Sequence, residues 1–245
     1  MAVIQNTAQA TFWVGIRYSQ RCERTCCQHL FCFFFHFLSR SFIFLQDTMD
    51  VITEYIDFSQ PTLYYILAHI FFNPLFWNTV ARAEYRSHIL TKLAGGNAYY
   101  GCYALAVTIF TIGITRDCLY ALALGNQPTY PALEAQWVQA LAVLLYVAGG
   151  TLVLTSMYAL GVTGTYLGDY FGILMDARVT GFPFNVCENP MYVGSTLNFL
   201  ATALWHASPA GLLLTAVVYV VYLVALEFEG PFTTMIYSKK NEKKE

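Results

Sequence analysis

Long stretches without charged residues divide this chain into apolar segments. Leu93–Thr115 lies between Lys92 and Arg116 and carries no charge. As a helix rising about 1.5 Å per residue it would be about 35 Å long, enough to cross the ~30 Å hydrocarbon core of a bilayer. We therefore predict a membrane helix there. The connection that follows, Arg116–Glu134, contains two prolines and is predicted as a loop.

Two further apolar segments are too long for a single straight crossing. Ala135–Gly168 would extend about 50 Å, so we predict its helix over Gln136–Leu160, ending where glycines become frequent. Asn189–Leu226 would extend about 57 Å, so we predict a helical hairpin with its turn at Ser208–Gly211. Such a hairpin places both ends of the segment at the same membrane face.

The first apolar segment, Thr62–Ala81, has a polar interruption at its middle. The pair Asn73-Pro74 lies there, and the residue before a proline is disfavoured in the helical conformation. We expect the segment to kink across the membrane or to lie partly within it. The charged residues from Arg82 to His88 are expected to end it in water.

Residues 1–48 differ in character from the rest of the chain. Arginines precede a short phenylalanine-rich run, as in a signal or signal-anchor, but no run reaches the roughly 20 apolar residues of a membrane span. We interpret 1–48 as an N-terminal extension, either a targeting segment or an artefact of gene prediction, and 49–245 as the membrane domain. Four cysteines here match no standard zinc spacing, so no metal site is predicted. They are Cys22, Cys26, Cys27 and Cys32.

The composition is that of an integral membrane protein. Hydrophobic residues make up 57% of the chain and charged residues 11%, whereas soluble domains carry about 25% charged residues. The predicted fold class is all-α, a polytopic membrane helical bundle with about four membrane helical segments. The formal net charge of −2 and the absence of a strongly basic face argue against nucleic-acid binding. Lysines from Lys239 to Lys244 favour a cytosolic C-terminus.

The polar stretch Gly161–Ser195 carries the candidate chemistry. Its glycines let the backbone approach a ligand or another helix, and charges beside a membrane usually serve a function. The alternative is an ordinary loop between helices. Arg178 can grip a phosphate or pair with Asp176 or anionic lipid, and Asp169 can relay a proton or simply end the glycine-rich part. Tyr192 is the third candidate catalytic residue.

Five long strings stand out between about Met49 and Tyr237: FNPLFWNTVAR, GTYLGDYFGIL, ARVTGFPFN, ENPMYVGST and FEGPFTTMIY. They resemble the phospholipid methyltransferase family. The resemblance implies stepwise N-methylation of phosphatidylethanolamine in the bilayer, through the monomethyl and dimethyl forms, to phosphatidylcholine. It also implies S-adenosyl-L-methionine as methyl donor, no metal, and the endoplasmic reticulum membrane as location, with mitochondrial membranes as a second location.

Members of this family bind the donor through Gly-x-Gly on the third helix and Glu-Glu at the end of the fourth. The matching positions here are Val147-Ala148-Gly149 and Glu229-Gly230, which keep the last glycine and the first carboxylate. The resemblance implies a donor site at these residues. On the residues alone, Gly149 and Gly150 indicate either close helix packing or close approach of a ligand. Glu229 indicates either a ligand contact or a solvated charge at a helix end.

Methyl transfer to an amine is an in-line displacement at a sulfonium carbon, which needs no metal and no protein nucleophile. The amine must be neutral, although its pKa in water is about 10, and a partly desolvated pocket lowers that value. Aromatic faces can hold the sulfonium and the methylated ammonium by cation–π attraction. Beyond this, the protein chiefly positions the two reactants.

Two other functions stay open from the residues themselves. One is a membrane methyltransferase of another lipid or of a prenylated cysteine, which assays of lipid extracts with labelled donor would separate. The other is a non-catalytic lipid-binding membrane protein, which the departures at Val147 and Gly230 make conceivable. Donor binding discriminates the second from an enzyme.

Overall fold

The computed structural model describes residues 53–242, and the predicted extension at 1–48 with its four cysteines lies outside the described residues. Tyr55–Glu245 form one compact unit. The regular elements in the described part are all helices, with no strand. This confirms the predicted all-α class.

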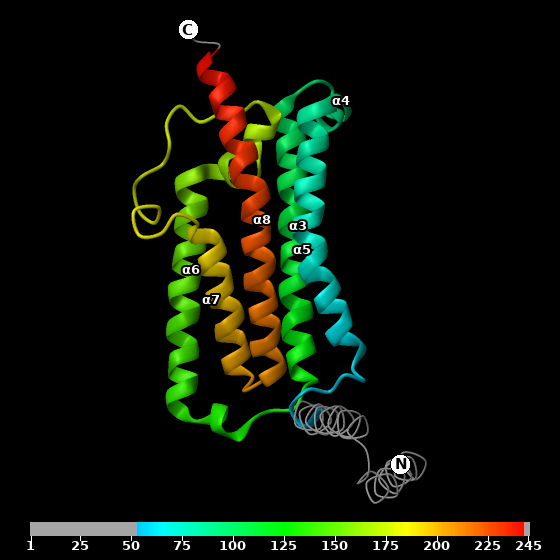
Figure 1. The fold of residues 1–245 in the computed structure, drawn as a ribbon, viewed down its shortest axis with the longest axis vertical. Helices are drawn as coiled ribbons and strands as arrows, with labels where there is room; N and C mark the ends of the chain where they lie inside the picture. The colour runs from blue at the N-terminus through cyan, green and yellow to red at the C-terminus, as the bar shows by residue number, and fades with distance from the viewer. Residues whose placement is uncertain (1–52, 243–245) are drawn as a thin grey trace, which may run out of the picture. The chain divides into compact units, whose positions relative to one another are not determined.

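Five long helices stand side by side in the unit (Figure 1). Within residues 53–242, three stretches are long and apolar enough to cross a membrane, namely Ala98–Gly125, Gln136–Phe171 and Pro209–Lys239. The chain is therefore a multi-pass membrane protein. The long helices are α3 (Pro61–Ser87), α5 (Ala98–Gly125), α6 (Gln136–Thr165), α7 (Pro190–Trp205) and α8 (Pro209–Glu242), and the short ones are α4 (Ile89–Leu93), η1 (Pro131–Glu134) and η2 (Gly168–Phe171).

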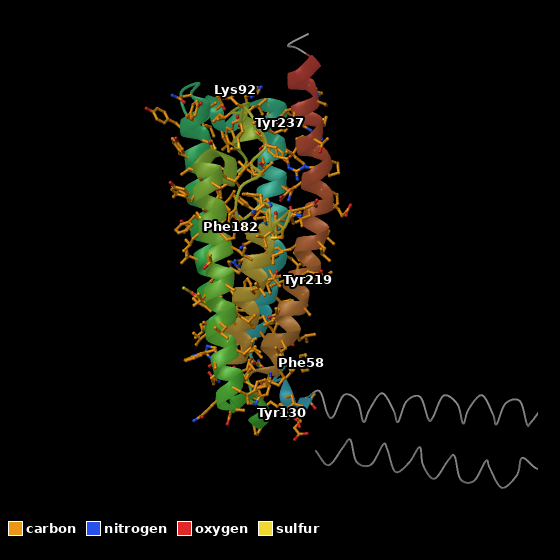
Figure 2. All side chains as sticks on the ribbon, turned by 90° about the vertical axis from the view of Figure 1, so that its left-hand side faces the viewer. Phe58, Lys92, Tyr130, Phe182, Tyr219 and Tyr237 are labelled. Atoms are coloured by element: carbon orange, nitrogen blue, oxygen red, sulfur yellow. The ribbon has the colours of Figure 1, made fainter. Side chains whose placement is uncertain are left out.

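The bundle has two ends, which we name after residues labelled in Figure 2. Lys92 lies at one end and Tyr130 at the other. Both α3 and α8 run from the Tyr130 end toward the Lys92 end, so they are parallel, whereas α5 and α7 run the opposite way (Figure 1). Two groups of basic residues therefore lie at the Lys92 end. One is Arg82, Arg86 and Lys92 in α3 and α4, and the other begins at Lys239 near the end of α8.

Helix α3 passes through the predicted interruption at Asn73-Pro74 without ending. A proline inside a helix removes one hydrogen bond but keeps a helical φ angle, so the helix continues past Pro74, which is compatible with the kinked segment that we expected. Asn73 is buried, with 2% of its surface exposed. The side-chain amide of Asn78 donates to the carbonyl of Pro74 at 3.2 Å.

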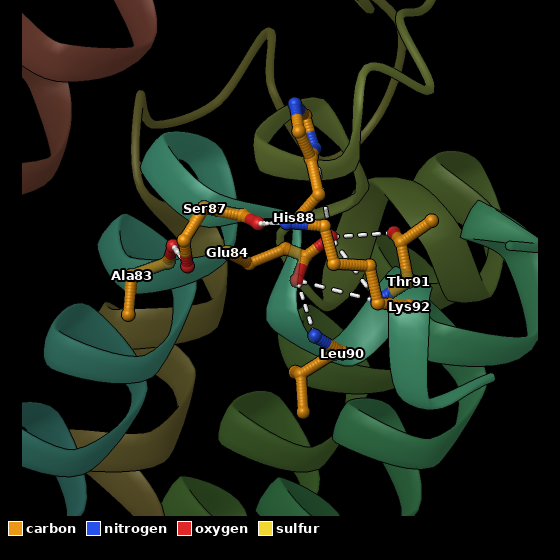
Figure 3. A network of polar contacts seen from close by, with 7 residues as sticks. All are labelled: Ala83, Glu84, Ser87, His88, Leu90, Thr91 and Lys92. Atoms are coloured by element: carbon orange, nitrogen blue, oxygen red, sulfur yellow. Dashed lines mark hydrogen bonds and ion pairs between the residues drawn. The ribbon is translucent and has the colours of Figure 1, made fainter.

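The end of α3 also differs from the prediction, because Glu84 does not lie in water. Its side chain is fully buried, and Figure 3 shows it pointing toward the start of α4, which follows it in the chain. One carboxylate oxygen accepts from the backbone N–H of Leu90 at 2.6 Å, and the Thr91 backbone and hydroxyl donate to the same carboxylate. Glu84 therefore fixes the turn between α3 and α4 by supplying acceptors for backbone N–H groups that have no partner within the helix.

Helix α5 extends through Arg116 to Gly125, so the predicted loop begins too early. Arg116 does not end the helix because its buried guanidinium has hydrogen-bond partners. The guanidinium donates to the Tyr222 hydroxyl at 2.7 Å and to the carboxylate of Asp117 at 2.8 Å. A charged residue is compatible with a membrane helix when it is paired in this way.

Helix α6 breaks where the glycines begin, as predicted. Gly161 has φ 64° and ψ −177°, a conformation outside the helical region that favours glycine. The last turn of α6 therefore leaves the axis of the preceding helix and crosses toward the middle of the bundle (Figure 1). This change of direction delivers η2 to a position where it packs against α3, α5, α6 and α8.

The predicted helical hairpin is confirmed, with its turn slightly earlier than expected. Helix α7 ends at Trp205, and α8 begins at Pro209, which occupies the first helical turn as proline often does. The Ser208 hydroxyl accepts from the backbone N–H of Gly211 at 3.2 Å and so caps α8. The two helices pack against each other and bring the start of α7 beside the later part of α8.

Candidate functional site

Glu229 on α8 receives hydrogen bonds from two other helices. The Trp77 indole N–H and the Asn78 amide, both on α3, donate to its Oε1 at 2.6 and 3.0 Å. The Tyr192 hydroxyl, on α7, donates to its Oε2 at 2.6 Å. We call these four residues the Glu229 junction.

The helix directions explain how the Glu229 junction forms. Because α3 and α8 are parallel, their later parts face each other, and Trp77 and Asn78 present donors to α8. The hairpin then brings the first turn of α7 to the same level, so Tyr192, two residues after Pro190, completes the set. The Tyr192 ring also packs edge-on against that of Tyr222, at 5.0 Å between centroids.

Helix η2 adds a second carboxylate near the Glu229 junction. The Thr233 hydroxyl, one turn beyond Glu229 on α8, donates to Asp169 at 3.1 Å. The neighbouring Tyr170 ring stacks on Phe232, with centroids 5.0 Å apart and planes 11° apart. The buried hydroxyl of Tyr170 has no hydrogen-bond partner among the described residues.

Arg82 lies on the α3 side of the same region. Its guanidinium donates to the backbone carbonyl of Phe228 at 2.8 Å and lies 4.7 Å from the centre of the Phe232 ring. Its Nε is buried and, like the Oδ1 of Asn78, has no partner within the described part of the chain. Unsatisfied buried polar atoms are uncommon in native proteins, and those of Arg82, Asn78 and Tyr170 leave hydrogen-bonding groups in this region that a ligand could use.

Among the candidate residues, the fold brings Tyr192, Asp169 and Glu229 to one region. Arg178 does not join them in the contacts described, because it is exposed on the connection between η2 and α7. Gly230 is also exposed, and a side chain added there would meet nothing within 4 Å.

Gly149 lies in a different contact, where α6 and α7 touch. A Cβ added to Gly149 would lie 2.5 Å from the carbonyl oxygen of Gly194 and would also clash with the Asn198 side chain. A Cβ added to Gly194 would lie 2.6 Å from the carbonyl of Gly149. We call this contact the α6–α7 seam. Its backbones are so close that only glycine fits, which supports the packing interpretation of Gly149.

The two predicted halves of the donor site are thus separate in this structure. Val147 and Ala148 are exposed on α6, beside the seam. Counted at ~1.5 Å per residue from the Tyr130 end, Gly149 lies about 20 Å along α6 and Glu229 about 30 Å along α8. Helix α7 packs against both of these helices.

Five side chains around the Glu229 junction were not singled out from the sequence as site residues. Three of them belong to the string FNPLFWNTVAR, whose polar members cannot be told from ordinary interface residues without knowing which face meets α8. The sequence signal that pointed to these three residues was the family-like string FNPLFWNTVAR itself. Four of the five such strings contribute a residue to this region. The five residues are Trp77, Asn78, Arg82, Tyr170 and Thr233.

The Glu229 junction has the groups that a methyl donor would require. A carboxylate offers about four acceptor positions, and three donors occupy Glu229, so Oε2 has room for a further ammonium or hydroxyl donor. Tyr192, whose hydroxyl bonds to Glu229, also brings an aromatic ring to the junction, and aromatic rings attract cations. The described residues include no cluster of three or more His, Cys, Asp or Glu side chains able to hold a metal ion.

Comparisons with known proteins agree with this picture of a membrane enzyme. The profile of the phospholipid methyltransferase family matches residues 137–240. A phosphatidyl-N-methylethanolamine N-methyltransferase from Emericella nidulans is 57% identical over 196 residues, covering 80% of this chain and 95% of the relative. The protein of that name from Saccharomyces cerevisiae is 52% identical, covering 82% and 97%. A phosphatidylethanolamine N-methyltransferase from Rattus norvegicus is 48% identical, covering 78% and 96%.

No solved structure matches the chain. The identity to these relatives extends over most of both partners. The chain therefore belongs to the phospholipid methyltransferase family.

Proposed function

We propose that this protein transfers methyl groups from S-adenosyl-L-methionine to the amine of phosphatidylethanolamine, stepwise to phosphatidylcholine. The observation that carries the proposal is the similarity to relatives named for the first and for the second acceptor of this sequence, at 48–57% identity over nearly their whole length. The convergence of four family-like strings on one region supports it. We place the reaction in the endoplasmic reticulum membrane, with mitochondrial membranes as a second location.

In this proposal the Glu229 junction binds the donor, which supplies a methyl group on a sulfonium that an amine can attack. Glu229 accepts from the donor's ammonium or hydroxyl groups through its remaining acceptor position. The hydrogen bonds from Trp77, Asn78 and Tyr192 hold the carboxylate in place. Such fixed geometry is the chief contribution of a protein to a displacement of this kind.

Asp169 is the proposed proton acceptor for the substrate ammonium, because the amine must lose a proton before it attacks. It lies on η2 within hydrogen-bond distance of Thr233, one turn from Glu229. In this scheme Gly149 contributes to the donor site indirectly, by letting α7 pack closely on α6 and so fixing Tyr192. Arg178 and Gly230 stay proposed site residues, and no described hydrogen bond links either of them to the Glu229 junction.

The test is a methylation assay on microsomes from cells that lack this activity and express the full chain. Labelled donor is supplied with either phosphatidylethanolamine or its monomethyl form, and the lipid products are separated. Transfer to both acceptors, ending at phosphatidylcholine, is expected. Transfer only to a prenylated cysteine or to another lipid, or donor binding without transfer, would contradict the proposal.

A second chain beginning at Met49 tests the domain division in the same assay. We expect it to insert and to methylate like the full chain, because the extension differs in character from the membrane domain. A loss of activity with normal membrane insertion would show that residues 1–48 take part.

A further inference from the structure

A groove lies beside Arg82, lined by residues of α3 and α8. Its volume is about 300 Å³. One cation, one carboxylate and a largely apolar wall line it, a combination that suits an amphipathic ligand with both charges. The lining residues are Arg82, Glu227, Phe228, Pro231, Phe232 and Met235.

Arg82 is the only lining group with a positive charge, and among the described residues no carboxylate forms an ion pair with it. The ion pairs among the described residues are Glu84–His88 and Arg116–Asp117. Arg82 makes one hydrogen bond in the described part of the chain, to a backbone carbonyl, and its buried Nε makes none. A half-buried guanidinium in this condition favours an anionic ligand, because charge-assisted hydrogen bonds are the strong ones.

The guanidinium is held in position before any ligand arrives. It packs over the Phe232 ring at 4.7 Å and near the Phe228 ring at 5.8 Å, and its hydrogen bond to the Phe228 carbonyl fixes its direction. Guanidinium groups stack on aromatic faces in this way and keep their remaining donors available. Arg82 is thus preorganised for an anion on the groove side.

The depth of the groove matches that of lipid headgroups. Counted at ~1.5 Å per residue from the Tyr130 end, Arg82 lies about 32 Å along α3 and Phe228 about 29 Å along α8. The hydrocarbon core of a bilayer is ~30 Å thick. If the Tyr130 end lies at one boundary of that core, Arg82 lies at the other.

The charges at the two ends support this placement. Arg82, Arg86, Lys92 and Lys239 lie toward the Lys92 end. The described residues 55–60 and 117–135, at the Tyr130 end, contain no lysine or arginine. The excess of basic residues places the Lys92 end at the cytosolic surface, where anionic groups of lipids are available.

From these observations we propose that Arg82 binds the phosphate of the phospholipid substrate, with the headgroup in the α3–α8 groove and the acyl chains along the outer faces of α3 and α8. This proposal rests on the proposed function. Exposed apolar side chains on both helices give the acyl chains a surface to lie on, among them Leu75, Val224 and Phe228. A soluble anion would not use that surface, which is why we assign the phosphate to a lipid.

The test compares Arg82→Gln and Arg82→Lys with Arg86→Gln as the matched control. Arg86 is an exposed arginine one helical turn further along α3 and does not line the groove. Mixed micelles give the KM for phosphatidylethanolamine at saturating donor, and the KM for the donor at saturating lipid. We expect Arg82→Gln to raise the lipid KM roughly tenfold to a hundredfold and to leave the donor KM unchanged. Arg82→Lys should raise it less, and Arg86→Gln less than about twofold.

A binding measurement extends the test to protein that is not turning over. Hexadecyl phosphate should raise the thermal unfolding temperature of the purified wild-type protein in neutral detergent, because a ligand of the folded state stabilises it. Hexadecanol and inorganic phosphate should not do so at the same concentration. The stabilisation should be lost in Arg82→Gln and kept in Arg86→Gln.

Several results would overturn the proposal. A raised donor KM with an unchanged lipid KM would assign Arg82 to the donor's carboxylate instead. Equal stabilisation by inorganic phosphate would mean that the site binds a phosphate ion and does not require a lipid. Should Arg82→Gln fail to accumulate, Arg82→Lys decides the matter, and wild-type lipid KM and wild-type stabilisation in that variant contradict the assignment. If the wild-type protein transfers no methyl group, the proposed function fails while the binding measurement still tests the phosphate site.

Discussion

The α6–α7 seam and the Glu229 junction both derive from the two sequence motifs predicted to bind the donor, but they are built in opposite ways. At the seam, Gly149 and Gly194 bring two backbones so close that no Cβ fits between them. At the junction, polar side chains from three helices meet around one carboxylate. Near the junction, polar atoms of Asn78, Arg82 and Tyr170 have no partner in the described part of the chain, whereas at the seam the Oδ1 of Asn198 is the one such atom.

A motif that resembles a family's binding motif can serve either helix packing or ligand binding, and the difference between the two regions separates these tasks. The seam is filled by protein atoms, so a change there should act on folding. The junction has unused hydrogen-bonding capacity, so a change there should act on ligand binding. The following four predictions test that division, beginning with the largest expected effect.

Gly149→Leu should abolish accumulation of the folded protein. The new side chain would overlap the Gly194 carbonyl and the Asn198 side chain, and helix α7 would have to move away from α6. Overpacking of a close contact by even a few atoms costs roughly 1–3 kcal/mol, and leucine adds four carbons. The measurement is membrane abundance together with the thermal unfolding temperature.

Gly150→Leu is the control, since a Cβ at Gly150 meets nothing within 4 Å. It should accumulate like the wild type. Normal abundance of Gly149→Leu with a raised donor KM would mean that a ligand, rather than α7, occupies the space at the seam.

Glu229→Gln should raise the donor KM roughly tenfold to a hundredfold, because hydrogen bonds to a charged group contribute about 1.5–3 kcal/mol. The amide keeps the size of the side chain but turns one acceptor into a donor, opposite the N–H and O–H groups of the junction. The apparent KM for the donor is measured at matched abundance.

Glu227→Gln is the matched control for the donor KM alone, since Glu227 is exposed two residues earlier on α8. The assignment is wrong if Glu229→Gln is silent while Glu227→Gln raises the donor KM. In that case the site lies on the other carboxylate.

Tyr192→Phe should raise the donor KM by roughly tenfold at most, because it removes one hydrogen bond to Glu229 while the two donors from α3 stay. The ring and its edge-on contact with Tyr222 are kept, so the stability of the hairpin should change little. Tyr219→Phe, on an exposed tyrosine of α8, is the control. Equal donor KM values in both variants would exclude Tyr192 from holding the carboxylate.

Thr233→Val should have the smallest effect, a decrease in kcat of about fivefold, corresponding to the loss of ~1 kcal/mol. It removes the 3.1 Å hydrogen bond to Asp169 with little change of volume. The control is Thr234→Val, whose hydroxyl bonds only to the carbonyl of Gly230 in its own helix. An identical kcat in both variants would mean that Asp169 needs no orientation by α8.

Much of the fold followed from the lengths of the apolar runs. The α7–α8 hairpin was predictable because its run exceeds one membrane thickness, and the break in α6 was predictable because only glycine suits the backbone at position 161. The extension of α5 through Arg116 was not. The partner that makes this charge acceptable, Tyr222, lies on a helix more than a hundred residues later.

The site was predictable only in part, for a similar reason. Tyr192, Asp169 and Glu229 stand in polar or unusual local sequence and could be selected one at a time. Trp77 and Arg82 lie in a helix whose polar residues all resembled a normal helix end, and their importance depends on which of them face α8. Glu84 shows the converse, since an ordinary-looking charge after an apolar run is a buried structural acceptor.

The long separation between the partners of Glu229 has a consequence for biosynthesis. Trp77 and Asn78 are 152 and 151 positions away from it. At about 5–20 residues per second, a ribosome needs roughly 8–30 s to make the intervening chain. During that time the polar side chains of α3 are in the membrane without their α8 partner. In a chain truncated before α8, Trp77 and Asn78 would never gain their partner Glu229. The cell's membrane quality control would then encounter an intact α3 with unpaired polar groups.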